Sequence, residues 1–277
     1  MSNSKYQRCT RCIMDNKSDD KIRFDKNGYC NYCTTALAIK DKKWFPNTIG
    51  EQKLQKMVQE VKAAGKGKKY DAILGLSGGL DSSYLTYIAY KLGLRVLVVH
   101  IDDEYDTEIA RENIRKLIKK TGFDYEVIKP DPEQYNALTL AFMKAGVANI
   151  ATPQDNIIFA FLYNRIKEYK ISYLLSGQNF SLESILQSDN THSARDLIHI
   201  KDIARRFCDT PIDKLKFIST TQYLTDRYFL KIKTLEPLDL VDYTRDKAFK
   251  ELADFCGFEY YGRKHLENIL TAFIQRF

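Results

Sequence analysis

The sequence predicts an α/β protein built on a doubly wound parallel sheet, with a cysteine-rich N-terminal module and a helical C-terminal region. Three observations predict it. Two cysteine pairs occupy the first 33 residues, apolar strand-length runs alternate with helical segments between residues 70 and 175, and the pattern beyond residue 185 is polar and helical, with no clear strand. We accordingly divide the chain into residues 1–45, 46–69, 70–185 and 186–277.

The N-terminal module contains two Cys-x-x-Cys turns, Cys9 with Cys12 and Cys30 with Cys33. Each turn directs two sulfurs to one point, and the two together supply the tetrahedron that zinc prefers. Because all four ligands are thiolates, no position remains for water or substrate, and we expect a structural zinc in a zinc-ribbon-like fold. An iron–sulfur cluster is the alternative metal, whereas disulfides suit a reducing compartment poorly.

Other residues of this module predict its local structure. Ile22, Phe24 and Tyr29 lie between the two cysteine pairs and predict short hairpin strands. The two remaining cysteines, Cys208 and Cys256, are isolated in the sequence, so they receive no role.

A helix and a linker lead from this module to the larger domain. Residues 44–47 are expected to form a boundary segment, and the helical spacing of Leu54, Met57 and Val61 predicts an amphipathic helix. The glycine- and lysine-rich residues 65–69 end this helix.

From residue 70 the pattern alternates between strand and helix. The segment RVLVVHI is continuous and β-branched, as a strand buried on both faces should be. We expect parallel strands joined by right-handed crossovers. The expected strands are 70–76, 95–101, 125–129 and 171–175, and the expected helices begin near Asp81 and span 107–120, 133–144 and 156–169.

Composition and charge narrow the class of protein. With 44% hydrophobic and 29% charged residues, no apolar run near the roughly 18 residues of a membrane span, and no signal-peptide core, we expect a cytoplasmic protein without a membrane partner. The net charge is +7, but residues 1–69 carry +9 and the remainder −2. Zinc-bound thiolates would lower the N-terminal excess, so we do not expect tRNA as a partner.

The loop after the first expected strand carries the chemistry. Two glycines let consecutive N–H groups point at one anion, the next helix adds its positive end, and serine hydroxyls reach the same oxygens. No lysine follows Gly79, which argues against a Walker ATPase, and no GxGxxG motif with a ribose-binding acid is present. The expected polyphosphate-binding residues are Leu76, Ser77, Gly78, Gly79, Leu80, Asp81 and Ser82.

Residues 77–82, SGGLDS, match in full the SGGxDS signature of the PP-loop ATP-pyrophosphatase superfamily, which the chain resembles. The resemblance implies the adenine-nucleotide α-hydrolase (PP-loop) fold, ATP as substrate, and attack at the α-phosphorus with pyrophosphate as leaving group. It also implies that Asp81 holds Mg²⁺ and that Ser77 and Ser82 take part in catalysis.

Further pieces resemble the N-acetyl sugar amidotransferase family, which makes acetamidino sugars for bacterial surface polysaccharides such as the LPS O-antigen. This resemblance implies that a sugar acetamido oxygen is adenylated and replaced by ammonia from a separate partner, similar to the glutaminase and cyclase of histidine biosynthesis. Gln178 in place of an expected glycine and an end at Phe277 depart from the family. The matching pieces are the cysteine pairs, His100-Ile101-Asp102 with Glu108 and Asn113, Thr152-Pro153 with Asp155, Leu175-Ser176-Gly177 with Asn179-Phe180, and Tyr261-Gly262 with Lys264-His265.

Residues outside the loop receive roles from the expected topology. The second strand ends beside the loop, so Asp102 is expected to face ribose or magnesium. Asp103 is expected either to do the same or to cap the next helix. His100 is expected either to contact the nucleotide or to be a buried core histidine. Gly177 is expected to let the backbone approach the nucleotide, with a simple turn as the alternative. Candidates for sugar-nucleotide or phosphate contacts, with a solvated basic face as the alternative, are His192, His199, Lys201, Lys264 and His265.

Two other functions use the same motif. A tRNA-thiolating enzyme would need sulfur-handling cysteines near the site, and residues 34–207 contain none. A nucleotide-binding module without turnover would not require the complete set of hydroxyl and carboxylate groups in residues 77–82.

Overall fold

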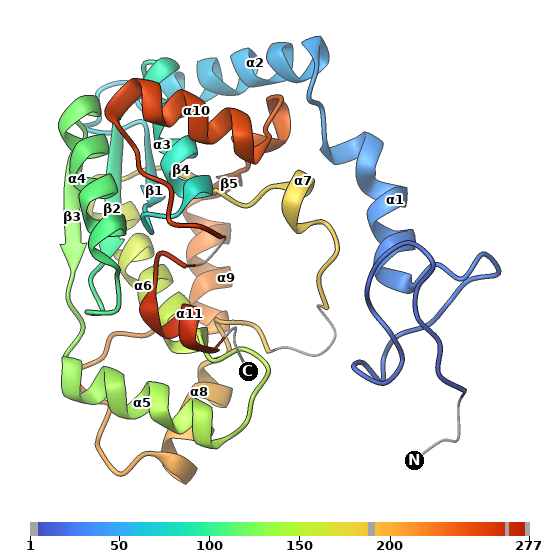
Figure 1. Cartoon of the computed structure of the whole chain (residues 1–277). Helices are drawn as coiled ribbons and strands as arrows, with labels where there is room; N and C mark the ends of the chain where they lie inside the picture. The colour runs from blue at the N-terminus through green and yellow to red at the C-terminus, as the bar shows by residue number, and fades with distance from the viewer. Residues whose placement is uncertain (1–4, 188–191, 264–265, 275–277) are drawn as a thin grey trace.

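The computed structural model describes residues 5–187, 192–263 and 266–274. Its centre is a sheet of five parallel strands in the order β3-β2-β1-β4-β5 (Figure 1). Because the order reverses beside β1, a crevice is expected at the carboxyl ends of β1 and β4. The strands are β1 (Ala72–Gly75), β2 (Val96–Ile101), β3 (Asp124–Ile128), β4 (Tyr173–Leu175) and β5 (Lys233–Leu235).

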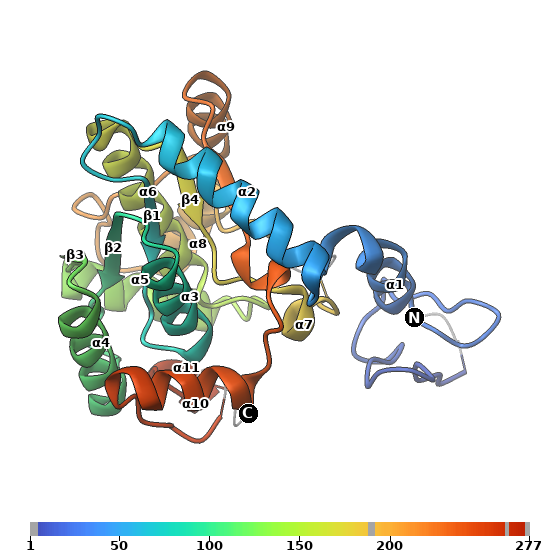
Figure 2. The same cartoon turned by 90° about the horizontal axis from the view of Figure 1, so that it is seen from above.

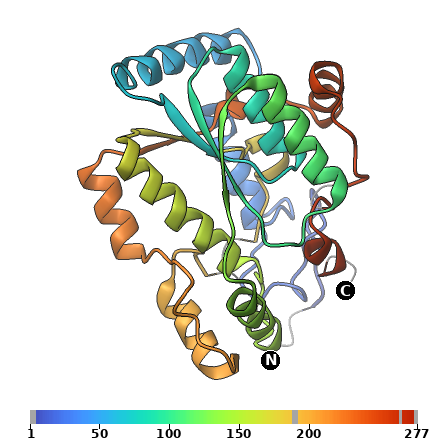
Figure 3. The ribbon, with the colours of Figure 1, turned by 90° about the vertical axis from the view of Figure 1, so that its left-hand side faces the viewer.

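Helices cover both faces of the sheet, as a doubly wound fold requires (Figures 2 and 3). Side chains alternate along the strands, so Leu74 and Val98 enter one core and Ile73 and Leu97 the other. The first core is covered by α3 (Leu80–Lys91), α4 (Glu108–Thr121) and α10 (Arg245–Cys256), and the second by α6 (Thr152–Tyr169).

The remaining helices extend these layers. Among them, α5 packs against α8, and Tyr223 of α9 lies against Tyr163 of α6, with ring centroids 5.1 Å apart. They are α5 (Pro132–Lys144), α7 (Phe180–Glu183), α8 (Leu197–Phe207), α9 (Thr220–Phe229), the 3₁₀ helix η2 (Pro237–Leu240) and α11 (Ile269–Ile274). Over the described residues, no helix has both the length and the apolar character that a membrane crossing demands.

The strand β5 corrects one expectation. We expected no strand beyond residue 185, yet Lys233–Leu235 pairs with β4 in parallel register. With three residues at the sheet edge, two of them exposed, β5 shows neither the apolar run nor the alternation by which a strand is recognised in sequence. Residues 233–235 therefore complete the same sheet as β1–β4.

The N-terminal module lies to one side of the sheet and is joined to it through α1 (Asn31–Lys43) and α2 (Thr48–Ala64) (Figure 1). Asn47 caps α2 by accepting from the amides of Ile49 and Gly50. The expected hairpin strands are reduced to single antiparallel bridges, Phe24 with Cys30 and Arg8 with Asp15. Turns therefore replace regular strands in most of the module.

Candidate active site and metal centre

The phosphate loop, residues 77–82, lies at the carboxyl end of β1 and is held by its own side chains. The amide of Ser77 donates to the Ser82 hydroxyl (3.1 Å), and the amide of Gly79 donates to the Ser77 hydroxyl (3.2 Å). Gly78 has a φ of +77°, a left-handed conformation that disfavours any side chain. The loop is therefore preformed around two serine hydroxyls.

The loop leads into the N-terminus of α3, where the backbone can approach a ligand. Gly79 is the N-cap of this helix and offers no capping side chain, so the positive end of the helix faces the cavity. Gly177, after β4, approaches the same turn, because a Cβ placed on it would lie 3.4 Å from Cα of Ser82. The two strand ends thus meet at one point.

Asp81 stands in the first turn of α3 and lines the cavity. The hydroxyl of Tyr243 donates to its carboxylate. Arg245 also lines the cavity; burial lowers the pKa of Arg245, but a hydrogen bond with Tyr260 and the charge of Asp81 outweigh burial and raise it. Two residues from the start of α10 and the loop before it therefore surround the carboxylate expected to hold magnesium.

A cavity of about 720 Å³ opens above the loop. Its described lining carries five carboxylates, one arginine and one histidine, so anionic phosphates require a cation there to offset the repulsion. The carboxylates are Asp81, Asp106, Asp155, Glu183 and Glu267, and the carboxamide side chains are Asn149, Gln154, Gln178 and Asn268.

Asp155 lies in the first turn of α6, is partly buried and lines the cavity. Burial raises the pKa of Asp155 to about 6, although a hydrogen bond with Asn149 opposes this shift. A carboxylate held in such a place is typical of an acid or base in a catalytic site.

Replacing this carboxylate, Asp155→Asn, is expected to stabilise the protein near pH 8 by roughly 2–3 kcal/mol, with a gain that vanishes towards pH 4. The folded pKa lies above the unfolded value, so the folded state loses stability as the pH rises from about 4 to 6 and the carboxylate ionises. Thermal unfolding over this pH range measures the gain. Asp209→Asn, at a carboxylate whose side chain is 96% exposed, is the matched control, and equal curves for both variants would contradict the expectation.

His100 lies buried in β2 and lines the cavity. Its Nδ1 is 2.8 Å from the carbonyl oxygen of Leu76, and its Nε2 is 2.9 Å from the carboxylate of Asp106. Burial lowers the pKa of His100, but the interaction with Asp106 outweighs burial and raises it. His100 therefore links the start of the phosphate loop to the end of β2. It is both a buried core histidine and a residue that lines the cavity.

Asp102 directly follows the last residue of β2, as we expected. It is absent from the described lining of the cavity and pairs instead with Lys129 at 3.1 Å. The contact of Asp102 with ribose or magnesium stays a prediction, and Asp106 is an acid after β2 that lines the cavity. Asp103 is buried and accepts hydrogen bonds from Tyr135 (3.0 Å) and Gln154 (2.7 Å), so it supports the wall rather than lining it.

Three basic candidates of the C-terminal region do not line the cavity. His192 stacks on His199 with ring centroids 4.0 Å apart and pairs with Asp196 at 3.4 Å. Neither histidine, nor the exposed Lys201, belongs to the described lining. Lys264 and His265 lie outside the described residues.

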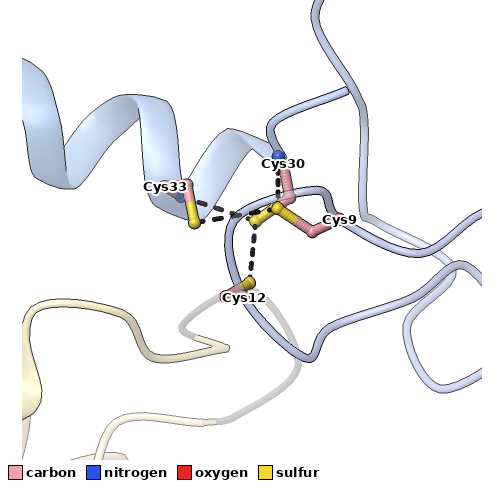
Figure 4. A group of neighbouring side chains, drawn as sticks. All are labelled: Cys9, Cys12, Cys30 and Cys33. Atoms are coloured by element: carbon pink, nitrogen blue, oxygen red, sulfur yellow. Dashed lines mark hydrogen bonds between the residues drawn. The ribbon is translucent and has the colours of Figure 1, made fainter. Parts of the chain in front are cut away.

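The four N-terminal cysteines converge on one point (Figure 4). The sulfur of Cys9 lies 3.8 Å from that of Cys33, and the sulfur of Cys12 lies 3.7 Å from that of Cys30. All four sulfurs lie within 4.8 Å of one another. This donor set can hold one metal ion with four thiolate ligands.

The surroundings of the cysteines favour thiolate at one of them. Burial raises the pKa of Cys9, but backbone amides of Arg11 (3.4 Å) and Cys30 (3.2 Å) donate to its sulfur and lower that pKa to about 6. Burial raises the pKa of Cys33 to about 12. A bound cation would offset this cost of burying thiolates.

Several lining residues were not found from the sequence. Asp155 and Tyr261 belong to the pieces that carry the family resemblance, but nothing in their local pattern gave them a role. Glu183 lies in α7 after β4, whereas Arg245 and Glu267 come from segments that follow β5. No local sequence pattern marks these residues, because the tertiary fold is what brings them to the loop.

Comparisons with known proteins find partial matches. The chain is 25% identical to tRNA-specific 2-thiouridylase MnmA 2 of Fusobacterium nucleatum, in a match that covers 40% of this chain and 34% of that protein. It is also 25% identical to the NH(3)-dependent NAD(+) synthetase of Thermoplasma acidophilum, in a match that covers 41% of this chain and 48% of that protein. It thus spans less than half the length of these curated relatives. The solved NH3-dependent NAD synthetase of Campylobacter jejuni aligns with a TM-score of 0.39 and 15% identity, covering 73% of this chain and 83% of that one.

No family model matches the chain. The α/β fold with its parallel sheet is confirmed, and the four-cysteine cluster is consistent with a zinc-ribbon-like module. Together with the SGGLDS loop at the end of β1, these partial matches indicate the PP-loop ATP-pyrophosphatase superfamily.

Proposed function

We propose that the chain is an ATP-dependent amidotransferase acting on an N-acetyl sugar, either nucleotide-linked or a nonulosonic acid. It adenylates the acetamido oxygen, and ammonia then converts this group to acetamidino, with release of AMP and pyrophosphate. The observation that carries the proposal is a single cavity that joins the phosphate loop to a wall of carboxamide side chains.

The phosphate side of the cavity is suited to a pyrophosphate leaving group. The hydroxyls of Ser77 and Ser82 and the positive N-terminus of α3 bind its oxygens, and Asp81 would hold Mg²⁺ in a lining rich in carboxylates. When bound, the magnesium ion neutralises charge on the departing pyrophosphate. Tyr243 fixes the direction of the Asp81 carboxylate through its hydrogen bond.

The rest of the cavity is suited to a polar acceptor. Asn149, Gln154 and Gln178 offer both donors and acceptors to sugar hydroxyls, and Phe159 adds an apolar surface. When ammonia attacks the adenylated carbon, a C–N bond forms, a proton passes to Asp155, and the C–O bond to AMP breaks. With a pKa of about 6, Asp155 is ionised at neutral pH and able to accept that proton.

The resemblance to a 2-thiouridylase keeps tRNA thiolation as the second candidate. Thiolation calls for a cysteine at the reacting centre, and none belongs to the described lining of the cavity. Cys208 and Cys256 hydrogen-bond to the backbone carbonyls of Thr210 and Leu252 instead. The lining therefore favours nitrogen transfer.

Zinc is the metal that we propose for the four-cysteine module, residues 1–45 with the ligands at positions 9, 12, 30 and 33. Four sulfurs around one zinc ion at about 2.3 Å lie about 3.8 Å apart in a tetrahedron, close to the 3.7 and 3.8 Å found here. A four-iron cluster bonds each cysteine to a different iron and spreads the sulfurs more widely. The spacing supports zinc.

We further propose a cytoplasmic enzyme whose ammonia comes from a partner glutaminase, because no glutaminase signature occurs in the sequence. The resemblance to an NH(3)-dependent synthetase supports free ammonia as the nitrogen source in vitro.

Product analysis tests the function. With Mg-ATP, ammonia and UDP-linked diacetamido sugars, we expect equal amounts of AMP and pyrophosphate and a sugar product that carries an acetamidino group, seen by mass spectrometry. Unmodified tRNA with a sulfur donor is the parallel reaction, and turnover there alone would establish the thiolase instead. Absence of AMP with every acceptor would favour a binding module, and formation of ADP would exclude pyrophosphatase chemistry.

A further inference from the structure

One segment, residues 177–185, touches both the nucleotide cavity and the four-cysteine module. At its start, Gly177 and Gln178 line the cavity, and Glu183 lines it again at the end of α7. Two residues later, Ile185 packs against the buried cluster formed by Cys9, Ile22, Cys30, Tyr32 and Cys33. We name residues 177–185 the connecting segment, and Figure 1 shows it between α1 and the sheet.

The middle of the connecting segment is anchored at the end of α1. Phe180, 9% exposed, stacks on Trp44 with ring centroids 6.4 Å apart, and its amide donates to the carboxylate of Asp239 (2.6 Å). The carbonyl of Asp239 accepts from the amide of Phe45 (2.8 Å). The residues that follow α1 and the connecting segment therefore share one attachment to the body.

The connecting segment also reaches the expected magnesium ligand through one intermediate. The hydroxyl of Ser181 donates to the carbonyl of Tyr243 (3.4 Å), and the hydroxyl of Tyr243 donates to Asp81. Asn179, 1% exposed, shapes the turn by accepting from the amide of Leu182 (2.9 Å). A shift of α7 would consequently disturb both Glu183 and the support of Asp81.

The Ile185 contact exists only while the cysteine module is folded. The module has a small core built largely from the cysteines themselves, and cores of this size depend on the bound metal. Without the metal, Ile185 would lose its partners, while Phe180 would remain attached through Asp239 and Trp44. The end of α7 would then be held on one side only.

We propose that Ile185 and Phe180 are positioning residues through which the metal-loaded four-cysteine module holds the wall of the nucleotide cavity. The inference rests on the proposed function, in that it takes Mg-ATP as the ligand of the cavity and zinc as the ligand of the cysteines. Because coupling between two binding sites is reciprocal, zinc should strengthen Mg-ATP binding and Mg-ATP should strengthen zinc binding by the same factor.

The first test compares zinc-loaded and zinc-free protein, the latter freed of chelator before use. We expect the Kd for Mg-ATP, from calorimetry, to rise about five-fold or more on zinc removal, and the Kd for zinc, from competition with a chromogenic chelator, to rise equally when Mg-ATP is withdrawn. Trp44 is the only tryptophan of the chain and stacks on Phe180, so its fluorescence should change in both titrations.

Variants separate positioning from folding. Ile185→Ser keeps all four cysteines, so we expect one equivalent of zinc, a Kd for Mg-ATP raised about five-fold, and no further rise on zinc removal. Leu186→Ser, at a neighbouring side chain that is 57% exposed, is the control and should behave as the original chain. If Ile185→Ser loses zinc, Phe180→Leu provides the same test far from the cysteines.

The outcomes distinguish this inference from the proposed function. If the original chain binds no Mg-ATP with or without zinc, the proposed function fails. If it binds Mg-ATP with the same Kd in both states, or if zinc-loaded Ile185→Ser and Phe180→Leu bind as tightly as the original chain, the coupling is overturned while the function stands.

Discussion

Asp81→Asn is expected to lower the rate of AMP and pyrophosphate formation by at least about 100-fold. Asn matches Asp in size, and Tyr243 can still donate to its carbonyl oxygen, so the loop and α3 should keep their structure. The substitution removes the charge that would hold magnesium beside a pyrophosphate leaving group. Assays quenched at fixed times measure the rate at which both products form. Thermal unfolding of the same samples checks that the variant is folded.

A nearby acid provides the matched comparison for this variant. Asp242 precedes Tyr243 but is 64% exposed at its side chain and pairs with Lys247. Asp242→Asn should retain the original rate, since surface pairs of this kind contribute little. Undiminished pyrophosphate release by Asp81→Asn would refute the assignment of this residue, whatever happens at Asp242.

The phosphate loop could be predicted from the sequence because its determinants are local. Gly78 adopts a left-handed conformation, Gly79 caps α3, and the two serines bond within six residues of each other. The β1, β2 and β4 strands were equally accessible, because buried parallel strands appear as continuous apolar runs. In this part of the fold, the residues that form the loop and the apolar runs that form the strands can both be recognised from the local sequence.

The other walls of the cavity could not be predicted, because no local pattern encodes them. Arg245, Tyr261 and Glu267 reach the loop only after β5 has joined the sheet and α10 has packed on α3. The acids after β2 show the same limit. The sequence pointed to Asp102 and Asp103, whereas the pairing of Asp106 with His100, which places Asp106 in the lining, is visible only in the fold.

Cys9→Ser is expected to reduce the bound metal from one equivalent to nearly none and to unfold the N-terminal module. Two backbone amides donate to the Cys9 sulfur, and its thiolate is the one with the lowered pKa, so its loss removes a ligand already suited to a cation. With Ile22 and Tyr32 as the main other members of the core, the module cannot offset the entropy of folding without the metal. Elemental analysis and limited proteolysis measure both effects.

A module that depends on its metal should melt separately from the sheet. We therefore expect Cys9→Ser to expose residues before Trp44 to protease while the thermal transition of the sheet persists, because the two cores flanking the sheet contain none of the four cysteines. Cys256→Ser is the control, since the Cys256 sulfur lies outside the four-cysteine cluster and donates to the carbonyl of Leu252, a role that a hydroxyl can take over. Full metal content and protease resistance in Cys9→Ser would contradict the four-thiolate site, and iron in place of zinc would contradict the interpretation of the sulfur spacing.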